Sequence, residues 1–416
     1  MTLLLLVLVP FIAWDVVLYV LKRRGDTDAA RREELLRHFT EEDIAAGREQ
    51  VRRRLVLYPF GRLLFYGFFG ALLFGGLGAR LEAHLLQVSG RWALTLPLFV
   101  LCILAGWSLL QLPLDAVSEL SIERRAGLST TTLGTFLADR VKGLVVGWIL
   151  TTLVAFPVIA LLRWLPVWWP LPAAAAIVAI SAFAAWLSPW LIAPLFNRFH
   201  PLEDGELASE VEALAERAGM AIPAGVLVTD ASRRSTTLNA YFTGLGSSRR
   251  VVLFDTLVES CGADETRVTV AHELGHWKHH HIAKLFVIES AGAAGGLLLL
   301  KLLLESPLRA SFGVPRPQSL VVLVLVVFLA SLAGVVTAPI LAALSRRFER
   351  QADRAALLLT DSPEAFIQLE KRLMRRAKAD LLTPALLHWM YGTHPLPEER
   401  IVAAERHLQR AGEQQM

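Results

Sequence analysis

The stretch AHELGHWKHHHIAKLFVIESAGAAGGLLLL, residues 271–300, joins a polar half to an apolar half. The polar half contains His272, Glu273 and His276 in the spacing HExxH, which is typical of a zinc-binding helix. From Ile282 onward the side chains are almost all apolar, as in a segment that crosses a membrane. Zinc sites of this type activate water, whereas a membrane span is surrounded by lipid. We therefore expect one helix that carries a metal site at the membrane border and then enters the bilayer.

The composition of the whole chain indicates a membrane protein. Of its 416 residues, 54% are hydrophobic and 19% are charged, against about 45–50% and about 25% in a typical soluble domain. The formal net charge of +4 is too small to indicate nucleic-acid binding, and two cysteines cannot form a disulfide framework. We therefore expect a multi-pass protein whose partner is the lipid bilayer, with no nucleic-acid partner.

Seven segments are long and apolar enough to span a bilayer, which takes about 20 residues. They are residues 2–21, 60–79, 92–113, 143–164, 171–195, 282–304 and 318–344. The first lacks a small-residue cleavage site, so we interpret it as a retained span rather than a cleaved signal peptide. Seven spans place the two termini on opposite sides of the membrane.

Lysine and arginine set the orientation, because they are enriched in cytosolic loops. Residues 22–54 contain ten of them, and the segments after the third and seventh spans are also rich. The loops on the other side have few basic residues, namely Arg80, Arg91, Arg163, Arg309 and Arg316. This asymmetry predicts that the C-terminus and the long polar stretches 196–281 and 345–416 are cytosolic.

The spans divide the chain into four parts. Residues 1–195 are an N-terminal membrane region with five spans and cytosolic loops. Residues 196–281 are a cytosolic region with the HExxH helix and short strands such as VLVTD and NAYFTG. Residues 282–344 are a transmembrane hairpin, and residues 345–416 are a C-terminal cytosolic helical region. The predicted fold class is an all-α multi-span membrane protein whose cytosolic zincin-like part contains a small β element.

Catalytic zinc takes three protein ligands, so HExxH needs a third. A histidine six residues after His276 is excluded, because that position is Ile282. Downstream, SRRFERQADRAA offers Glu349 and, one turn later, Asp353. Glu349 would complete a site of two histidines and one glutamate, and Asp353 would bond the free nitrogen of a ligand histidine. The short loop between the last two spans makes them an antiparallel hairpin, which returns Glu349 to the membrane face that His272 left.

The chain resembles the type I CAAX prenyl protease family of multi-span zinc metalloproteases. The matching stretches are SIERRAGLSTTTLGTFLADRVK, APLFNRFHPLEDGEL, NAYFTGLGSSRRVVLFDTLVE, DETRVTVAHELGHWKHHH, SRRFERQADRAA and YGTHPLPEERI. The resemblance implies a barrel of about seven helices around a chamber, with the zinc site at its cytosolic end.

The resemblance also implies roles for individual residues. His272, His276 and Glu349 would be the ligands of one zinc ion, Glu273 the general base and acid, and Asp353 a support of the ligands. It further implies that Asn239 and Ala240 align the substrate and that His394 and Arg400 contact the transition state. For Arg400 a carboxylate-binding role and a structural ion pair both remain open.

The chain departs from the family at two places. Thr237 stands where the family usually has a histidine, which leaves any substrate contact there in doubt. Of the run His279, His280 and His281, only the last matches the usual pattern. His280 lies four residues after His276 and could reach the metal, but we interpret all three as solvated histidines at the membrane interface.

These features predict a zinc-dependent integral-membrane endopeptidase that cleaves near the C-terminus of prenylated CAAX-type or other membrane-associated substrates. One alternative is a quality-control protease of the HtpX type, although such chains are shorter and have fewer spans. A more remote alternative is a zinc-bearing transporter without hydrolysis, but transport sites lie near the bilayer midplane. Abundant Ala, Leu and Arg with few Lys suggest a bacterial source, and hence the inner membrane.

Overall fold

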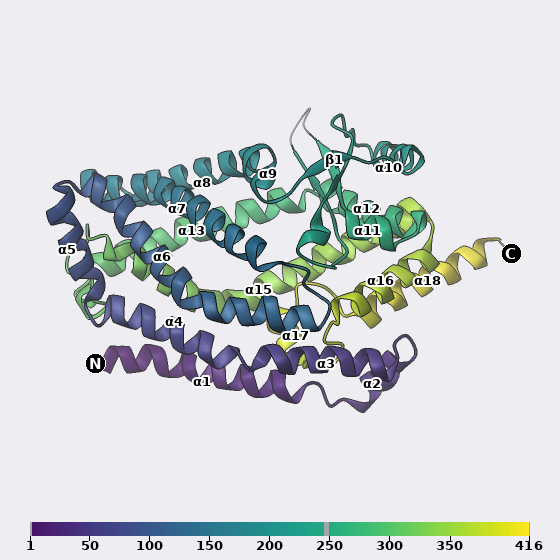
Figure 1. The fold of residues 1–416 in the computed structure, drawn as a ribbon, viewed down its shortest axis with the longest axis horizontal. Helices are drawn as coiled ribbons and strands as arrows, with labels where there is room; N and C mark the ends of the chain where they lie inside the picture. Colours follow the sequence, from purple (N-terminus) through teal and green to yellow (C-terminus); the bar gives the residue numbers. More distant parts are fainter. Residues whose placement is uncertain (1, 245–248, 416) are drawn as a thin grey trace.

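The structure, a computed structural model, describes residues 2–244 and 249–415. Long helices run along the molecule, and a small sheet with shorter helices lies at one end (Figure 1). The N-terminus lies at the end away from the sheet, whereas the C-terminus lies beyond the sheet (Figure 1). The termini therefore occupy opposite ends of the molecule.

The first half of the chain is almost entirely helical. Its helices are α1 (Thr2–Arg24), α2 (Ala29–Leu36), α3 (Glu41–Leu55), α4 (Tyr58–Leu73), α5 (Leu77–Ser89), α6 (Trp92–Val117), α7 (Leu133–Trp164), α8 (Pro170–Leu187) and α9 (Ala193–Phe196). Two π-helical turns, Ser118–Glu123 and Ser188–Ile192, continue α6 and α8.

Six helical stretches among the described residues are long and apolar enough to cross a membrane. They are Glu41–Leu73, Trp92–Glu123, Leu133–Trp164, Pro170–Phe196, His281–Glu305 and Val321–Thr360. The six overlap the second to seventh predicted spans, so the multi-pass prediction is confirmed, although the stretch within the predicted span 60–79 ends at Leu73. The first predicted span, residues 2–21, lies within the continuous helix α1. This helix is not among the six stretches, so the predicted count of seven spans is not confirmed.

An acidic residue inside α1 is fully paired. The Asp15 carboxylate accepts hydrogen bonds from Tyr58 at 2.8 Å, Tyr66 at 2.6 Å and Arg62 at 2.7 Å. All three donors belong to α4. Since an unpaired charge within an apolar layer is costly, this cluster fastens α1 to α4.

The stretch that begins with HExxH forms two helices, so the single-helix prediction is wrong. Helix α12 (Ala263–Lys278) ends before the histidine run, and α13 (His281–Glu305) begins within it. Between them His280 has φ of 54°, in the left-handed region that non-glycine residues rarely adopt. The zinc motif and the membrane segment therefore belong to separate helices.

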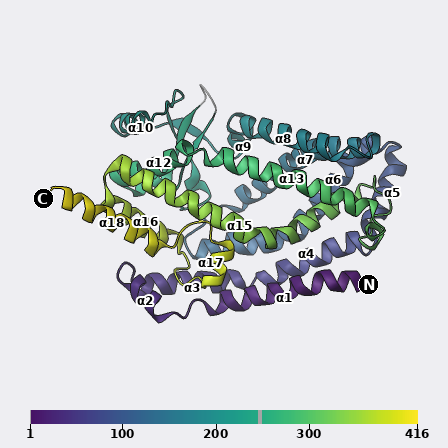
Figure 2. The ribbon, with the colours of Figure 1, turned by 180° about the vertical axis from the view of Figure 1, so that it is seen from behind.

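The last span and the Glu349 segment, in contrast, are one helix. Helix α15 (Val321–Thr360) is continuous for 40 residues, and α14 (Leu308–Ser311) lies in the connection from α13. Near α14 the two long helices share an apolar core, in which Leu300 and Leu304 pack with Val321 and Val324. Figure 2 shows α13 and α15 extending from that end toward α12.

The end of the molecule that contains the sheet has a mixed fold. Its strands are β1 (Phe199–Pro201), β2 (Val226–Thr229), β3 (Ala240–Thr243) and β4 (Arg250–Phe254), in the order β1-β2-β4-β3. Strand β2 pairs with β4 in parallel, and the other two pairs are antiparallel. Strand β3 is therefore an edge strand. Helices α10 (Gly205–Arg217), α11 (Asp255–Ser260) and α12 contact the sheet. Helix α16 (Pro363–Ala377) packs on α12, α17 (Ala385–Tyr391) packs on α15, and α18 (Pro397–Gln415) packs on α16 and α15.

Helices α12 and α15 approach each other closely at Gly275. A Cβ atom on Gly275 would lie 2.9 Å from Ala352 Cα and 2.9 Å from Ala355 Cβ. Around this crossing one apolar core combines residues from both polar stretches, including Leu274 and Leu357. The predicted second and fourth parts of the chain thus share a single core.

We predict that Gly275→Ala lowers the melting temperature of the detergent-purified protein. The added methyl group has no space, and overpacking of this kind costs about 1–3 kcal/mol. The matched control is Gly296→Ala in α13, where an added Cβ meets no atom within 4 Å. A Gly275→Ala protein that melts like the wild type would show that the crossing is looser than described.

Candidate metal centre

The α12–α15 crossing brings three donor groups to one point. His272 and His276 come from α12, and Glu349 comes from α15. The Nε2 atoms of the two histidines are 3.1 Å apart. Glu349 places Oε2 3.3 Å from His272 Nε2 and Oε1 3.4 Å from His276 Nε2. The three residues predicted as ligands therefore converge.

Each imidazole has a polar neighbour at its other nitrogen. Nδ1 of His272 lies 2.9 Å from Asp353 Oδ1. Nδ1 of His276 lies 3.1 Å from Nδ1 of His281, and Nε2 of His281 lies 2.8 Å from Gln351 Oε1. Such contacts fix the ring orientation of metal-binding histidines. Both rings thus present Nε2 to the same point.

The donor set fits a zinc ion. Tetrahedral zinc has its nitrogen and oxygen ligands at about 2.0–2.2 Å, which places the ligand atoms about 3.4 Å from one another. The observed separations of 3.1, 3.3 and 3.4 Å are close to this value. Glu349 Oε2 is also buried without a hydrogen-bond partner among the described residues. A cation would satisfy this oxygen.

Glu273 faces a cavity of about 140 Å³ next to the donor atoms. His272, Glu349 and Asn239 line the same cavity. Burial raises the pKa of Glu273 to about 7, and the Glu349 charge adds to the shift while His272 opposes it. A bound dication would lower this pKa. A carboxylate in this position can accept a proton and return it.

Arg400 lies behind the ligands and forms two buried ion pairs. Its guanidinium donates to both oxygens of Asp353, at 2.6 and 2.9 Å, and to Glu370 Oε2 at 2.6 Å. Glu370 is only 2% exposed, and burial raises its pKa. Arg400 therefore forms the ion pair that was one of the two alternatives for it, and its partner Asp353 is also the neighbour of His272 Nδ1. Arg400 also lines the cavity.

His394 and the β3 edge lie at the same cavity. The exposed His394 side chain has Nε2 3.4 Å from Glu349 Oε2 and Nδ1 3.0 Å from Thr393 Oγ1. Asn239 lines the cavity and directly precedes β3, which begins at Ala240. Both groups predicted to contact substrate therefore adjoin the donor atoms.

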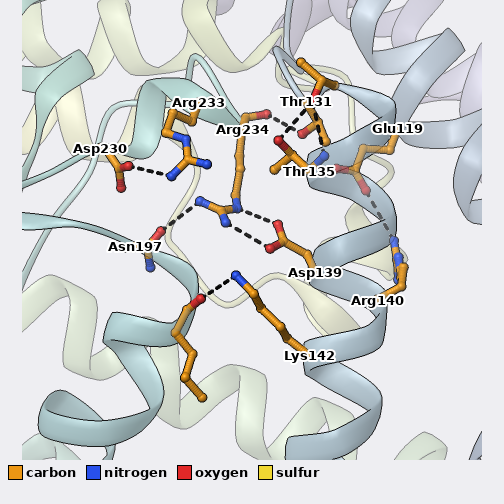
Figure 3. Close-up of polar contacts among 12 residues, drawn as sticks. Glu119, Thr131, Thr135, Asp139, Arg140, Lys142, Asn197, Asp230, Arg233 and Arg234 are labelled. Carbon is orange, nitrogen blue, oxygen red and sulfur yellow. Dashed lines mark hydrogen bonds and ion pairs between the residues drawn. The ribbon is translucent and has the colours of Figure 1, made fainter.

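A network around Arg234 holds the segment that leads into β3 (Figure 3). Arg234 forms a bidentate ion pair with Asp139 of α7, at 2.7 and 3.0 Å, and donates a hydrogen bond to Asn197 Oδ1 at 3.2 Å. Its carbonyl oxygen accepts a hydrogen bond from Thr131 Oγ1 at 3.1 Å. The edge strand is thus connected to a membrane helix through charged groups that are distant in sequence.

The prediction that the histidine run is solvated is wrong for His281. His280 is exposed, but His281 is 2% exposed and stacks on the Phe348 ring at 4.1 Å between centroids. The sequence signal was present, because His281 alone of the three matches the family pattern. Sequence reasoning also missed Arg234 and Glu370, whose partners lie in distant segments.

Comparisons with known proteins match both halves of the chain. A family model described as peptidase family M48 matches residues 201–408. A model described as CAAX prenyl protease N-terminal, five membrane helices, matches residues 28–198.

Individual relatives agree with these matches. The chain is 32% identical over 319 residues to the CAAX prenyl protease 1 homolog of Arabidopsis thaliana, covering 74% of each chain. It is 35% identical over 184 residues to CAAX prenyl protease 1 of Saccharomyces cerevisiae, covering 43% of this chain and 40% of that protein. The crystal structure of S. mikatae Ste24p has the same fold, with a TM-score of 0.79, 24% identity and coverage of 94% and 96%.

We predict that His281→Ala weakens metal retention and that His280→Ala does not. Loss of a residue that orients a metal-binding histidine typically lowers metal affinity by about 10–100-fold, whereas His280 is exposed. The measurement is the zinc content of each variant in a titration with a chelator. Equal retention by the two variants would remove His281 from the site.

Proposed function

Because the chain belongs to peptidase family M48, we propose that it is a zinc-dependent membrane endopeptidase whose single zinc ion is held by His272, His276 and Glu349. The observation that carries this proposal is the convergence of two Nε2 atoms and one carboxylate at the spacing of tetrahedral ligands. The metallopeptidase family and the apolar helices make the chain a multi-pass membrane protease.

The residues around the donor atoms have different roles in the proposed peptide hydrolysis. A zinc ion bound there would supply a Lewis acid that activates water and polarises a carbonyl group. Glu273 removes a proton from the attacking water and later returns it to the leaving nitrogen. His394, at the exposed side of the cavity, donates a hydrogen bond to the developing oxyanion. Arg400 keeps Asp353 ionised, and Asp353 orients His272.

The substrate is an extended peptide that pairs with the β3 edge. An edge strand leaves backbone groups free to add another strand, and Asn239 with Ala240 stands where this edge meets the cavity. The names of the relatives suggest cleavage next to a prenylated cysteine near a C-terminus. The membrane would hold the prenyl group of such a substrate while its peptide enters the cavity.

The metal centre faces the cytosol in this proposal. The sequence asymmetry in Lys and Arg supports a position of the sheet end inside the cell, and the composition supports a bacterial inner membrane. The match of residues 28–198 to a region of five membrane helices favours the CAAX type over the shorter HtpX type. The donor residue Glu349 lies beyond the apolar segment 318–344, contrary to expectation for a transporter.

We predict that Glu273→Gln retains zinc and loses peptidase activity by at least about 100-fold, the usual contribution of a general base. The assay is cleavage of a farnesylated CAAX peptide in detergent, with the unmodified peptide in parallel. Glu259→Gln, an exposed position on α11, is the matched control. Full activity of Glu273→Gln would refute this mechanism, and equal rates on both peptides would argue against prenyl specificity.

We further predict that Arg234→Gln raises KM more than it lowers kcat. The change removes the ion pair with Asp139 and loosens the strand that aligns substrate, while the zinc residues are untouched. Arg233→Gln is the control, because neighbouring Arg233 pairs with Asp230 in a more exposed position. A fall in kcat with unchanged KM would contradict a role in substrate alignment.

A further inference from the structure

We infer that a cavity at the end of the molecule away from the metal centre binds a phosphate-bearing anion. The cavity has a volume of about 740 Å³, within the range of about 300–1,000 Å³ that is usual for ligand sites. Three arginines, Arg91, Arg163 and Arg316, line it. It lies beside α5, which Figure 1 shows at the end opposite the sheet.

The three arginines come from three different segments of the chain. Arg91 directly precedes α6, Arg163 is in the last turn of α7, and Arg316 is in the segment that leads into α15. The predicted extracytosolic loops contain only two other arginines, Arg80 and Arg309, and neither lines the cavity. Three of the five arginines in these predicted loops therefore converge on one place.

The described residues neutralise only part of the positive charge in the cavity. Among the residues that the structure describes, none of the three arginines has a carboxylate within 4.0 Å. Glu82, the acidic residue that lines the cavity, is buried and accepts a hydrogen bond from the Ser319 hydroxyl. Three guanidinium groups against one carboxylate leave two positive charges in excess.

The Arg163 side chain is fixed by two contacts and still has unused N–H donors. One terminal nitrogen donates to the Gln318 carbonyl at 2.8 Å, and the guanidinium lies over the Trp92 ring at 5.0 Å from its centroid. Its Nε is buried and has no hydrogen-bond partner in the described part of the chain. Among the described residues Gln318 is the one hydrogen-bond partner of this guanidinium, so its other terminal nitrogen can donate to an acceptor oxygen in the cavity.

Phosphate is the anion that this arrangement suits. Guanidinium groups bind phosphate through paired hydrogen bonds, and an anionic phospholipid presents such a phosphate at the membrane border. Apolar surface adjoins the cavity, since Trp164, which lines it, is 68% exposed. The phosphate can belong to an anionic phospholipid or be a free ion, and binding experiments distinguish these sources.

The test compares two double variants of the full-length protein in detergent. Arg91→Gln with Arg316→Gln removes two charges from the cavity, and Arg80→Gln with Arg309→Gln removes two charges from the same side outside it. Native mass spectrometry measures retention of phosphatidylglycerol against phosphatidylcholine. Melting temperatures are measured with and without inorganic phosphate. Elution volume and ligand-free melting temperature verify folding, and Arg316→Gln alone serves if the first double variant does not fold.

We expect the wild type and the outside variant to bind phosphatidylglycerol at least tenfold more tightly than phosphatidylcholine, and the cavity variant to lose this preference. If inorganic phosphate alone raises the melting temperature of the wild type and not of the cavity variant, the proposal holds with a free anion as ligand. Equal behaviour of the wild type and the cavity variant toward both probes would overturn it.

Discussion

The close contact of α12 with α15 at Gly275 is the constraint on which the site depends. Because a glycine stands at the crossing, the helix axes approach closely enough for His272 and His276 to meet Glu349. Helix α15 is also an apolar membrane helix, so the geometry of the metal centre is tied to helix packing in the membrane. The break at His280 separates the motif from the next membrane helix and brings His281 back to support His276.

Paired charged side chains lie buried behind the metal centre. Asp353 lies between His272 and Arg400, and Arg400 lies between Asp353 and Glu370. Each charge has a partner of opposite sign, so removal of one member leaves another buried and unpaired, which is strongly destabilising. This series of contacts, from Glu370 through Arg400 and Asp353, ends at Nδ1 of His272.

Much of the site could be predicted from the sequence, because its residues follow local rules. The spacing of His272 and His276 fixes one helix face, and hairpin topology returns Glu349 to it. The turn at His280 could not be predicted, since a non-glycine residue with positive φ has no local signature. The pairing of Arg234 with Asp139 was missed for another reason: its partners are 95 residues apart, and packing alone brings them together.

The most direct test of the account is anomalous diffraction at the zinc absorption edge from crystals of the metal-loaded protein. We predict one zinc peak per chain, within bonding distance of Nε2 of His272, Nε2 of His276 and the carboxylate of Glu349. A peak bonded to His280, or a zinc ion without Glu349 among its ligands, would contradict it.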